Sequence, residues 1–405
     1  MKKEIVIMHV ISLEEITFLF RFENALMSKK LVPVYTTTSL FCYFYLRLRS
    51  KNVFIARYSS GKPMSCEYDN RKFFNVEVGW LTKENAIKCY EGMLSLANKL
   101  VKEYKVKACF IPSGRLASHE ALKKVCDENN IPTIFSGYGN FPGKTFFDPA
   151  GTDKASSIYD MPEKLERYSY NKDDYGKWRK EYISSKLKSH VVTQAQKVTY
   201  KSYLSRTMRI LFCKIERFFN VATDVDRGLS SLKDLKAISL ERFQVSSLPT
   251  EFCFFPLQYS LDAQIILNYS GDYVGALEGA LAVARERCLP LVIKPHPVEN
   301  SNEAFNLVDE FVSKNPDVYV SLTNTFQLIS AAKFVITVNS TVGLESKILD
   351  KDVVFLGDSI YKGMTEESIP KYLFGYLVDV DYFAKSAISD NLINEIFDKC
   401  GVLSD

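Results

Sequence analysis

The sequence lacks the cysteine and histidine patterns that are typical of metal-binding or disulfide-rich proteins. Its nine cysteines form no Cys-x-x-Cys pair and no cluster with histidine at metal-ligand spacing. We therefore expect reduced thiols that fill the core of a cytoplasmic protein. The only histidines are His9, His119, His190 and His296, too few and too scattered to suggest a histidine-based metal site. The expectation is that the protein binds no metal ion.

Long apolar runs and a strong charge imbalance are also missing. No segment approaches the roughly 18 uninterrupted apolar residues of a transmembrane helix. The apolar start at 5–8 is broken by His9, Glu14 and Glu15 and leads to no small-residue cleavage site, so we expect no signal peptide. A net charge of +4 is small for 405 residues and does not suggest nucleic acid. We expect a cytoplasmic protein, and a place on a membrane surface stays open.

Strand-like and helix-like segments alternate in two runs along the chain, over 1–160 and over 250–382. This alternation indicates parallel sheets with crossover helices, and 405 residues favour two domains over one. The fold class that we predict is α/β, with two Rossmann-like domains. The sequence of residues 383–405 predicts a last helix. Whether this helix crosses back to the first domain stays open. The apolar segments of the two runs are 4–9, 31–35, 53–56, 108–111 and 133–135, then 253–258, 264–267, 289–294, 317–321, 334–338 and 352–356.

The stretch between these runs, 161–249, predicts a basic helical insertion or linker. Residues 161–220 carry 14 Lys and Arg against 6 Asp and Glu, with tyrosines interleaved. One interpretation is a set of solvated helices that link two domains. Another is a basic, aromatic surface for an anionic lipid-linked glycan or a membrane face. RNA binding is the third, although no nucleic-acid motif accompanies the charge.

Two apolar strands of the second run end in residues that bind anions. The first ends in Lys294-Pro295-His296-Pro297, and the second, 334–338, breaks into 339–345, Asn-Ser-Thr-Val-Gly-Leu-Glu. Free N–H groups at a helix N-terminus and a nearby Lys or His can all bind one phosphate. The pattern predicts a site for the phosphate of a nucleotide, with Lys294 and His296 donating to its oxygens. The alternative is a turn whose prolines simply end the strand.

The residues that follow the second of these strands have individual alternatives. Ser340 or Thr341 can cap the next helix, which explains one hydroxyl but not two. Gly343 allows a backbone to approach a ligand closely. Glu345, one turn later, can accept hydrogen bonds from ribose hydroxyls. Together they favour a nucleotide over a cap alone.

Three further residues are candidates for chemistry or substrate binding. Asp262 is either a helix N-cap or a carboxylate that faces an anomeric carbon as nucleophile or electrostatic stabiliser. Arg115, which follows a strand end, is either a surface residue or a clamp for a carboxylate or phosphate. Tyr138 is a weaker candidate for the same role.

These elements, in this order, resemble the bacterial capsule-synthesis family of Kdo transferases. The resemblance rests on Pro256-Leu257-Gln258 with Asp262, on Lys294-Pro295-His296-Pro297, on the 339–345 segment, and on Phe355-Leu-Gly-Asp-Ser-Ile-Tyr361-Lys-Gly. A loop with Gly139 and Asp148 looks like the family's N-terminal signature. The match covers about 108–151 and 250–365. It implies a GT-B architecture, two Rossmann-like domains facing a cleft, and CMP-β-Kdo as donor with retention of configuration.

The resemblance also implies roles for single residues. Asp262 matches the nucleophile, and the Lys-Pro-His-Pro and Ser-Thr-Val-Gly elements match the residues that hold the CMP phosphate. An acidic residue associated with the position two before Gly139 is Gly137 here, which leaves the general acid/base unassigned. Metal is not implied, since the nearest Asp-x-Asp sequences, at 224–226 and 379–381, follow no obvious strand end. The residues expected at the site are Asp262, His296 and Lys294 as catalytic, Gln258, Asn339, Ser340, Thr341, Gly343, Glu345 and Tyr361 as donor-binding, and Arg115 and Tyr138 as substrate- or carboxylate-binding.

The sequence thus predicts a retaining glycosyltransferase that builds a bacterial surface polysaccharide, either capsule or O-antigen. Its expected partners are the nucleotide-sugar donor and a lipid-linked glycan acceptor, with no cofactor and no nucleic acid. Peripheral contact with the inner membrane and membership of a larger multi-transferase stay open. One alternative is a CDP-glycerol-type glycerophosphotransferase, and another is a polysaccharide-assembly module without catalytic activity.

Overall fold

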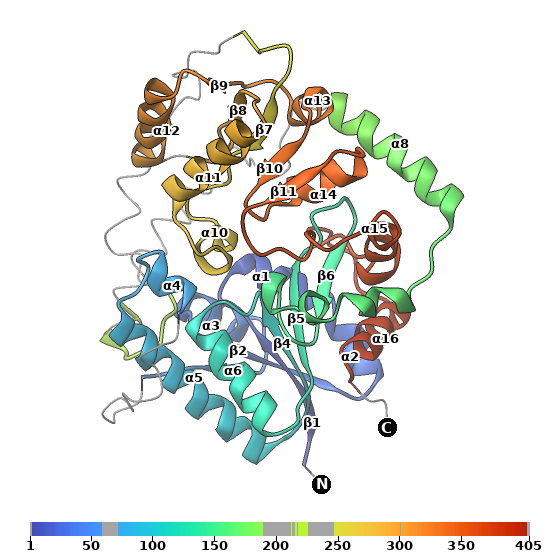
Figure 1. The fold of residues 1–405 in the computed structure, drawn as a ribbon. Coiled ribbons are helices and arrows are strands. Elements are labelled where there is room, and N and C mark those ends of the chain that lie inside the picture. The colour runs from blue at the N-terminus through green and yellow to red at the C-terminus, as the bar shows by residue number, and fades with distance from the viewer. Residues whose placement is uncertain are drawn as a thin grey trace. The chain divides into compact units, whose positions relative to one another are not determined.

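The computed structural model describes residues 2–58, 72–188, 212, 215, 216, 218–225, 247–299 and 301–402. The chain divides into two compact units (Figure 1). The first takes in Met1–Asp160, Thr199–Leu229 and Leu377–Asp405, and the second takes in Met161–Val198 and Ser230–Tyr376. Each unit is built on its own sheet of mainly parallel strands, which confirms the predicted class of two Rossmann-like α/β domains.

The sheet of the first unit has the strand order β3-β2-β1-β4-β5-β6. All neighbours are parallel except β5 and β6, which are antiparallel. Because β1 lies between β2 and β4, the crossovers leave it in opposite directions, as in doubly wound folds. The strands are β1 (Glu4–His9), β2 (Val32–Thr37), β3 (Val53–Ile55), β4 (Lys105–Pro112), β5 (Thr133–Tyr138) and β6 (Thr145–Asp148).

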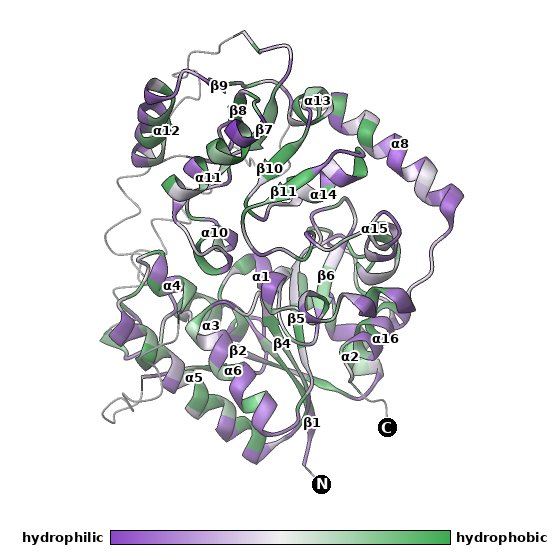
Figure 2. Cartoon of the chain, viewed as in Figure 1, coloured by the Kyte–Doolittle hydropathy of each residue, from purple (hydrophilic) through white to green (hydrophobic). Residues whose placement is uncertain are grey.

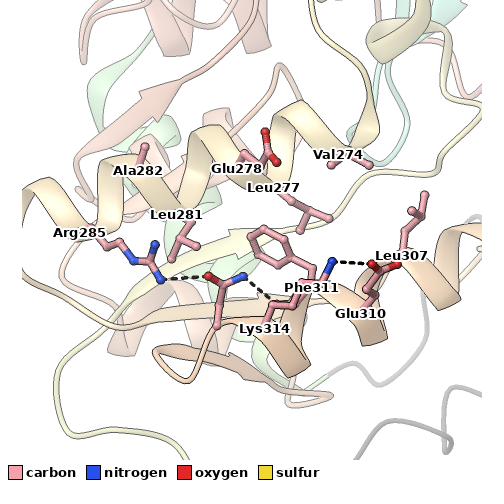
Figure 3. A pocket seen from close by; sticks show the side chains of 11 residues that line it. Val274, Leu277, Glu278, Leu281, Ala282, Arg285, Leu307, Glu310, Phe311 and Lys314 are labelled. Atoms are coloured by element: carbon pink, nitrogen blue, oxygen red, sulfur yellow. Dashed lines mark hydrogen bonds and ion pairs between the residues drawn. The ribbon is translucent and has the colours of Figure 1, made fainter.

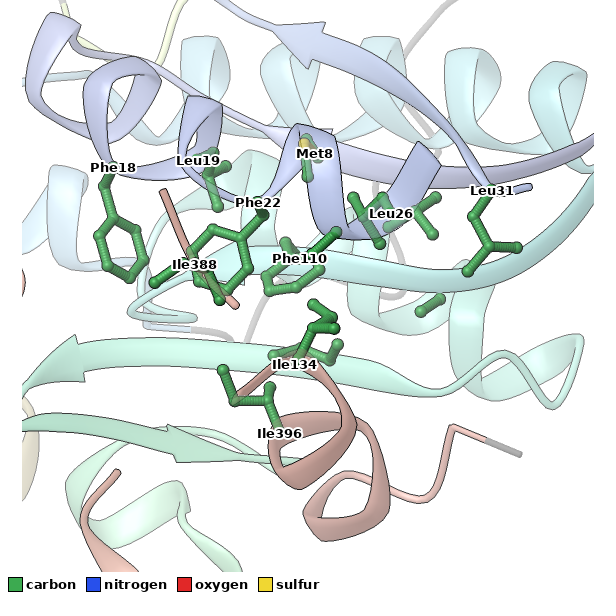
Figure 4. Close-up of a cluster of buried hydrophobic side chains, with 14 of the residues drawn as sticks. Met8, Phe18, Leu19, Phe22, Leu26, Leu31, Phe110, Ile134, Ile388 and Ile396 are labelled. Atoms are coloured by element: carbon green, nitrogen blue, oxygen red, sulfur yellow. The ribbon is translucent and has the colours of Figure 1, made fainter. Parts of the chain in front are cut away.

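Helices cover both faces of this sheet, because successive strand residues face opposite sides. Val6 and Met8 of β1 join a core with α1, α2 and α16, whereas Ile5 and Ile7 join a core with α5 and α6. Figure 4 shows the first of these cores, in which Ile396 of α16 lies beside the sheet. The last helix therefore packs within the first unit. The helices are α1 (Leu13–Phe20), α2 (Glu23–Ser28), α3 (Leu40–Arg47), α4 (Phe74–Glu77), α5 (Lys83–Glu103), α6 (Ala117–Glu128), α7 (Ser157–Asp160) and α16 (Asp390–Lys399).

The second unit repeats this plan with five parallel strands in the order β11-β10-β7-β8-β9. Cys253 and Phe255 of β7 face one core and Phe254 faces the other, so this sheet is also covered on both sides. The strands are β7 (Cys253–Pro256), β8 (Leu291–Lys294), β9 (Val318–Val320), β10 (Val335–Thr337) and β11 (Val353–Phe355). The helices are α8 (Lys172–Lys188), α10 (Ala263–Asn268), α11 (Tyr273–Glu286), α12 (Asn302–Lys314), α13 (Thr325–Ala331), α14 (Thr341–Ile348) and α15 (Ser368–Lys371).

Part of the predicted linker belongs to the second unit. Helix α8 is mostly hydrophilic in Figure 2, yet it buries Tyr182. Trp178 stacks on that ring with centroids 4.9 Å apart, and Arg179 donates to the carbonyl of Ile348. This half of the basic segment is therefore a packed helix. Much of the rest, including His190, Tyr200 and Tyr203, lies outside the described residues.

Three local expectations from the sequence are corrected. The apolar segment 264–267 is not a strand but lies within helix α10, since a short apolar run does not distinguish the two. The helical spacing of apolar residues over 13–29 predicts one helix, whereas the structure has two, α1 and α2. Residues 145–148, expected as part of a loop, form the antiparallel strand β6. Among the described helices, none is long and apolar enough to cross a bilayer.

Candidate functional site

Four loops meet at the carboxyl edge of the second sheet, and most predicted residues lie on them. The loops follow β7, β8, β10 and β11. From β7 the chain continues to one side of the sheet, and from β10 it continues to the other side. Open α/β sheets bind ligands at the carboxyl ends of the strands where the strand order reverses in this way. The parallel sheet thus brings together segments that are up to about 100 residues apart in the sequence.

Gln258 and Asn339 join the ends of β7 and β10. The Gln258 side-chain amide donates to Asn339 Oδ1 at 3.1 Å, and the Asn339 backbone N–H donates to Gln258 Oε1 at 3.2 Å. Asn339 Nδ2 also donates to the Gln264 carbonyl of α10 at 2.7 Å. Both side chains are buried. Their observed contacts hold the two strand ends and α10 in register, and a direct bond to a donor stays a prediction.

Asp262 is the N-cap of α10. Its Oδ1 accepts a hydrogen bond from the Gln264 backbone N–H at 2.9 Å, so the capping interpretation is confirmed. The cap occupies one carboxylate oxygen, and the side chain is half-buried. The cap also fixes the direction of the carboxylate, which a nucleophile needs.

His296 lies within the electrostatic reach of Asp262. Burial lowers the pKa of His296, while the carboxylates of Asp262 and Glu299 act in the opposite direction. The backbone N–H of Val298 donates to His296 Nδ1 at 3.3 Å. Since Nδ1 accepts, the proton of the neutral ring must be on Nε2. His296 therefore presents its Nε2–H as a donor to an anion that binds beside it.

Glu299 was not predicted, yet it ties two of the loops together. Its Oε2 accepts from the Ser260 backbone N–H at 2.7 Å, and its Oε1 accepts from Ser301 N–H at 3.0 Å. Its own N–H donates to the His296 carbonyl at 3.0 Å. Glu299 thus fixes the Asp262 loop against the His296 turn. An acidic residue three positions after His296, inside a turn, was the sequence signal.

Lys294 turns toward the neighbouring loop. Its Nζ donates to the Thr323 carbonyl at 2.7 Å and to Thr325 Oγ1 at 3.1 Å. Burial lowers the pKa of Lys294. Two of the three N–H groups of this ammonium thus hold the start of α13, which leaves one for a phosphate oxygen.

Ser340 caps α14, and Thr341 is the first residue of that helix. Ser340 Oγ accepts from Val342 N–H at 3.1 Å, and the Ser340 N–H donates to Thr337 Oγ1 at 3.3 Å. The capping alternative is therefore confirmed for Ser340. The helix start lies at the carboxyl edge beside Asn339, where its N–H groups favour an anion.

Gly343 has a packing reason that the sequence did not reveal. A Cβ atom at this position would lie 2.5 Å from Cζ of Phe355 and 3.1 Å from Cγ2 of Thr337. The space next to Gly343 is thus filled by strands β10 and β11. Helix α14 packs so closely on the sheet that position 343 has no room for a side chain. The sequence had instead suggested that the glycine allows a ligand to approach the backbone.

We expect Gly343→Ala to destabilise the protein by about 1–3 kcal/mol, because the Phe355 ring must move to accept the methyl group. The measurement is the midpoint of urea unfolding. Gly363→Ala is the matched control, since a Cβ there meets nothing within 4 Å. Unchanged stability together with weakened nucleotide binding would instead support the ligand interpretation of Gly343.

Glu345 is engaged by helix α8. Its Oε1 accepts from the Tyr182 hydroxyl at 2.7 Å and pairs with Lys186 Nζ at 3.0 Å. Glu345 and Tyr182 are both buried. Helix α8 thus holds this carboxylate in place, and the contact with ribose stays a prediction. No local sequence pattern indicates the pair with Tyr182, because about 160 residues separate the partners.

Tyr361 lies on the loop after β11. Ser359 in that loop donates from its hydroxyl to the Asn339 carbonyl at 3.4 Å and accepts from Tyr361 N–H at 3.2 Å. Lys347 holds the end of the same loop by donating to the carbonyls of Lys362 and Met364. The structure therefore places Tyr361 beside the Asn339 segment, as expected.

The two predicted residues of the first unit are in separate places. Arg115 pairs with Asp153, which lies in the turn after β6. Tyr138, at the end of β5, donates its hydroxyl to Glu14. Arg115 thus has an internal partner, and Tyr138 belongs to a different cluster of side chains.

A cavity of about 530 Å³ lies between α11 and α12 (Figure 3). Leu277, Leu281 and Phe311 form its apolar part, with Arg285 and Glu310 at its margin. No predicted residue lines it. The polar loops at the carboxyl edge remain the candidate site, since they combine a carboxylate, an imidazole and a helix N-terminus.

Comparisons with known proteins find matches that include this part of the chain. The family described as "Capsule polysaccharide biosynthesis protein" matches residues 174–371. This range includes the later part of the basic segment, for which the sequence suggested no counterpart, and excludes the predicted match at 108–151. Protein FixF of Sinorhizobium fredii is 30% identical over 150 residues, which are 36% of this chain and 36% of FixF. The match thus takes in about a third of the length of FixF.

Several solved structures are similar in outline. "Thermosulfurimonas dismutans KpsC, beta Kdo 2,7 transferase" has a TM-score of 0.41 and 13% identity, covering 98% of this chain and 99% of that chain. The corresponding "beta Kdo 2,4 transferase" has a TM-score of 0.36 and 16% identity, covering 74% and 94%. A glycosyltransferase from Rickettsia africae has a TM-score of 0.31 and 13% identity, covering 98% and 94%.

The family match covers most of α8 and the four loops of the candidate site, from Gln258 to Tyr361. Residues 174–371, just under half of this chain, are thus similar to the family described as capsule polysaccharide biosynthesis proteins.

Proposed function

We propose that the protein is a retaining β-Kdo transferase that uses CMP-β-Kdo to build a bacterial surface polysaccharide. The observation that carries this proposal is that the Asp262 carboxylate, fixed as the N-cap of α10, and His296 lie within electrostatic reach of each other at the carboxyl edge of the second sheet. A fixed carboxylate and an imidazole N–H are the two groups that such a transfer requires. The match of residues 174–371 to the capsule polysaccharide biosynthesis family supports a glycan product.

The proposed reaction has two displacements. A carboxylate oxygen of Asp262 attacks the anomeric carbon of Kdo, and the bond from that carbon to the phosphate oxygen breaks, releasing CMP. An acceptor hydroxyl then attacks the same carbon from the opposite side, loses its proton to a base, and frees Asp262. Two inversions give net retention.

The other side chains act on the leaving group. The Nε2–H of His296 donates to a phosphate oxygen of CMP, and the imidazole becomes more basic as negative charge develops there. Lys294 contributes positive charge, and the N-terminus of α14 with Ser340 and Thr341 provides N–H groups. Gln258, Asn339 and Tyr361 shape the place where the nucleotide binds, and Glu345 accepts from its ribose. Arg115 is proposed for the sugar carboxylate or the acceptor, which requires release of its pair with Asp153.

The donor is tested by thermal unfolding with CMP, CDP and UDP. A ligand at 100 times its dissociation constant stabilises the folded state by about 2.7 kcal/mol. We expect CMP to raise the melting temperature more than CDP or UDP. A larger effect of CDP would favour the CDP-glycerol alternative, and no effect of any nucleotide at millimolar concentration would favour a module without catalytic activity.

Substitution of Ser340 locates the nucleotide. We expect Ser340→Ala to reduce the CMP-dependent shift, because it removes a hydroxyl at the start of α14. Ser389→Ala is the matched control, since Ser389 caps α16 of the first unit in the same way. An equal CMP shift in both variants would place the phosphate elsewhere.

A further inference from the structure

A pair of exposed aromatic rings lies at the carboxyl edge of the first sheet. Tyr138 ends β5, and Phe383 belongs to the loop before α16. The two rings stack with centroids 5.4 Å apart and planes 23° apart. They remain 49% and 61% exposed. Two stacked rings in nearly parallel planes that stay this exposed present an apolar ring face to the solvent, and such a face can bind a ligand.

The loop that carries Phe383 is held rigidly. The buried Arg21 donates to the carbonyls of Ser386 at 2.7 Å and Asp381 at 2.6 Å. Tyr382 stacks on Phe18 with centroids 4.1 Å apart, and its ring edge meets Tyr138 at 4.9 Å. The rings are thus positioned before any ligand arrives, which reduces the entropy lost on binding.

Two carboxylates lie at the margin of the rings. The Tyr138 hydroxyl donates to Glu14. The backbone N–H groups of Ile11 and Ser12 donate to Oε2 of the Glu15 side chain, at 2.6 Å and 3.0 Å. The other oxygen, Oε1, accepts no hydrogen bond from the described residues. Burial raises the pKa of Glu15 to about 7, although those bonds lower it. At neutral pH this carboxyl group can accept or donate a proton.

We propose that Tyr138, Phe383, Glu14 and Glu15 form a subsite for a neutral sugar of the glycan acceptor. A pyranose has an apolar C–H face that fits flat rings and hydroxyls that donate to carboxylates. The two acidic side chains repel phosphates and acidic sugars. The assignment of this sugar as the acceptor rests on the proposed function.

The subsite is tested by saturation-transfer-difference NMR on the full chain. The probes are methyl β-galactoside and methyl α-rhamnoside as neutral sugars and methyl β-glucuronide as the acidic one. We expect the neutral sugars to bind and the glucuronide to bind more weakly. Phe383→Ala should weaken binding about tenfold or more, as loss of a central aromatic contact does. Glu14→Gln should bring the affinity for glucuronide closer to that for the neutral sugars.

The matched control is Phe44→Ala, which removes a ring that is 49% exposed on α3 of the same unit. We expect it to bind the sugars as the wild type does. The proposal is overturned if Phe383→Ala binds equally well, if glucuronide binds as tightly as the neutral sugars, or if no probe binds at about 50 mM.

The CMP-dependent thermal shift separates this proposal from the proposed function. Phe383→Ala should keep the full shift. Sugar binding without any CMP shift would remove the donor assignment and leave the subsite. A CMP shift without sugar binding would remove the subsite and leave the donor.

Discussion

Replacement of Asp262 by asparagine is expected to abolish Kdo transfer while leaving the fold and CMP binding intact. Asparagine is as good an N-cap as aspartate, so its Oδ1 still accepts from Gln264 N–H. The amide cannot act as the nucleophile. Loss of a covalent catalytic group lowers kcat by about 10⁴-fold or more, so CMP release should fall to the spontaneous rate of CMP-Kdo breakdown.

The measurements are CMP release from CMP-Kdo and the intact mass of the protein. Without an acceptor, the wild type should accumulate a covalent Kdo adduct, and Asp262→Asn should show none. Asp272→Ala is the matched control, because Asp272 caps α11 of the same unit by accepting from Gly275 N–H. It loses a comparable cap, worth about 1 kcal/mol, and should retain activity.

Several outcomes would contradict the nucleophile assignment. Asp262→Asn could release CMP at the wild-type rate, or it could form the same adduct. If Asp262→Ala and Asp272→Ala lose activity to the same extent, the effect comes from capping and not from chemistry. Such a result would leave Asp262 as a structural residue of α10.

The convergence of the candidate residues could be predicted, and their individual contacts could not. Parallel strands bring their carboxyl ends to one edge, so polar residues after β7, β8 and β10 had to meet once the alternation was recognised. The topology places Gln258 near Asn339, but the hydrogen bond between their side chains could not be predicted from it. The strand order therefore explains why these residues meet, and their side-chain packing explains which contacts they make.

Contacts between distant elements escaped prediction because no local pattern encodes them. The partner of Glu345 comes from α8, and the residue that demands a glycine at 343 is Phe355 on β11. Helix α10 was misjudged for a different reason, since a short apolar run fits strand and helix equally. The contact of Tyr138 with Glu14 likewise joins residues 124 positions apart.

The stability of the first unit is expected to depend steeply on pH through two buried histidines. His9 bonds to Thr36 Oγ1 at 3.1 Å and Ser118 Oγ at 3.0 Å. His119, 1% exposed, has no hydrogen-bond partner for either ring nitrogen among the described residues. Burial lowers the pKa of His9 to about 3, and burial with the charges of His9 and Arg115 lowers that of His119.

The direction of this pH dependence follows from whether the folded or the unfolded state binds the protons more tightly. Below the ordinary value of 6.5, the unfolded chain protonates these histidines and the folded unit does not. The free energy of unfolding therefore falls by about 1.4 kcal/mol per pH unit for each histidine. For His9 this loss extends from 6.5 down to about 3. Glu15 has the opposite effect, because burial raises its pKa from the ordinary 4.5 to about 7. Between these pH values the folded unit binds the proton more tightly, so the free energy of unfolding rises as the pH falls.

The test compares wild type with His119→Leu by urea unfolding at several pH values. Of the two tryptophans, Trp80 lies in the first unit and Trp178 in the second. In a Trp178→Phe background, the fluorescence of Trp80 therefore reports on the first unit alone. At pH 7.5 we expect His119→Leu to be about 1–3 kcal/mol more stable, since it removes buried polar atoms without partners.

The pH dependence of that difference distinguishes a buried neutral histidine from a simple packing effect. The advantage of His119→Leu should grow by about 1.4 kcal/mol per unit as the pH falls from 6.5. Glu15→Gln keeps the capping contacts of α1, and its advantage should instead shrink as the pH falls from 7 toward 4.5. Because the two differences have opposite slopes, a general acid sensitivity of the unit cannot imitate both. A constant difference for His119→Leu would show that this ring is already protonated, or hydrated, in the folded protein.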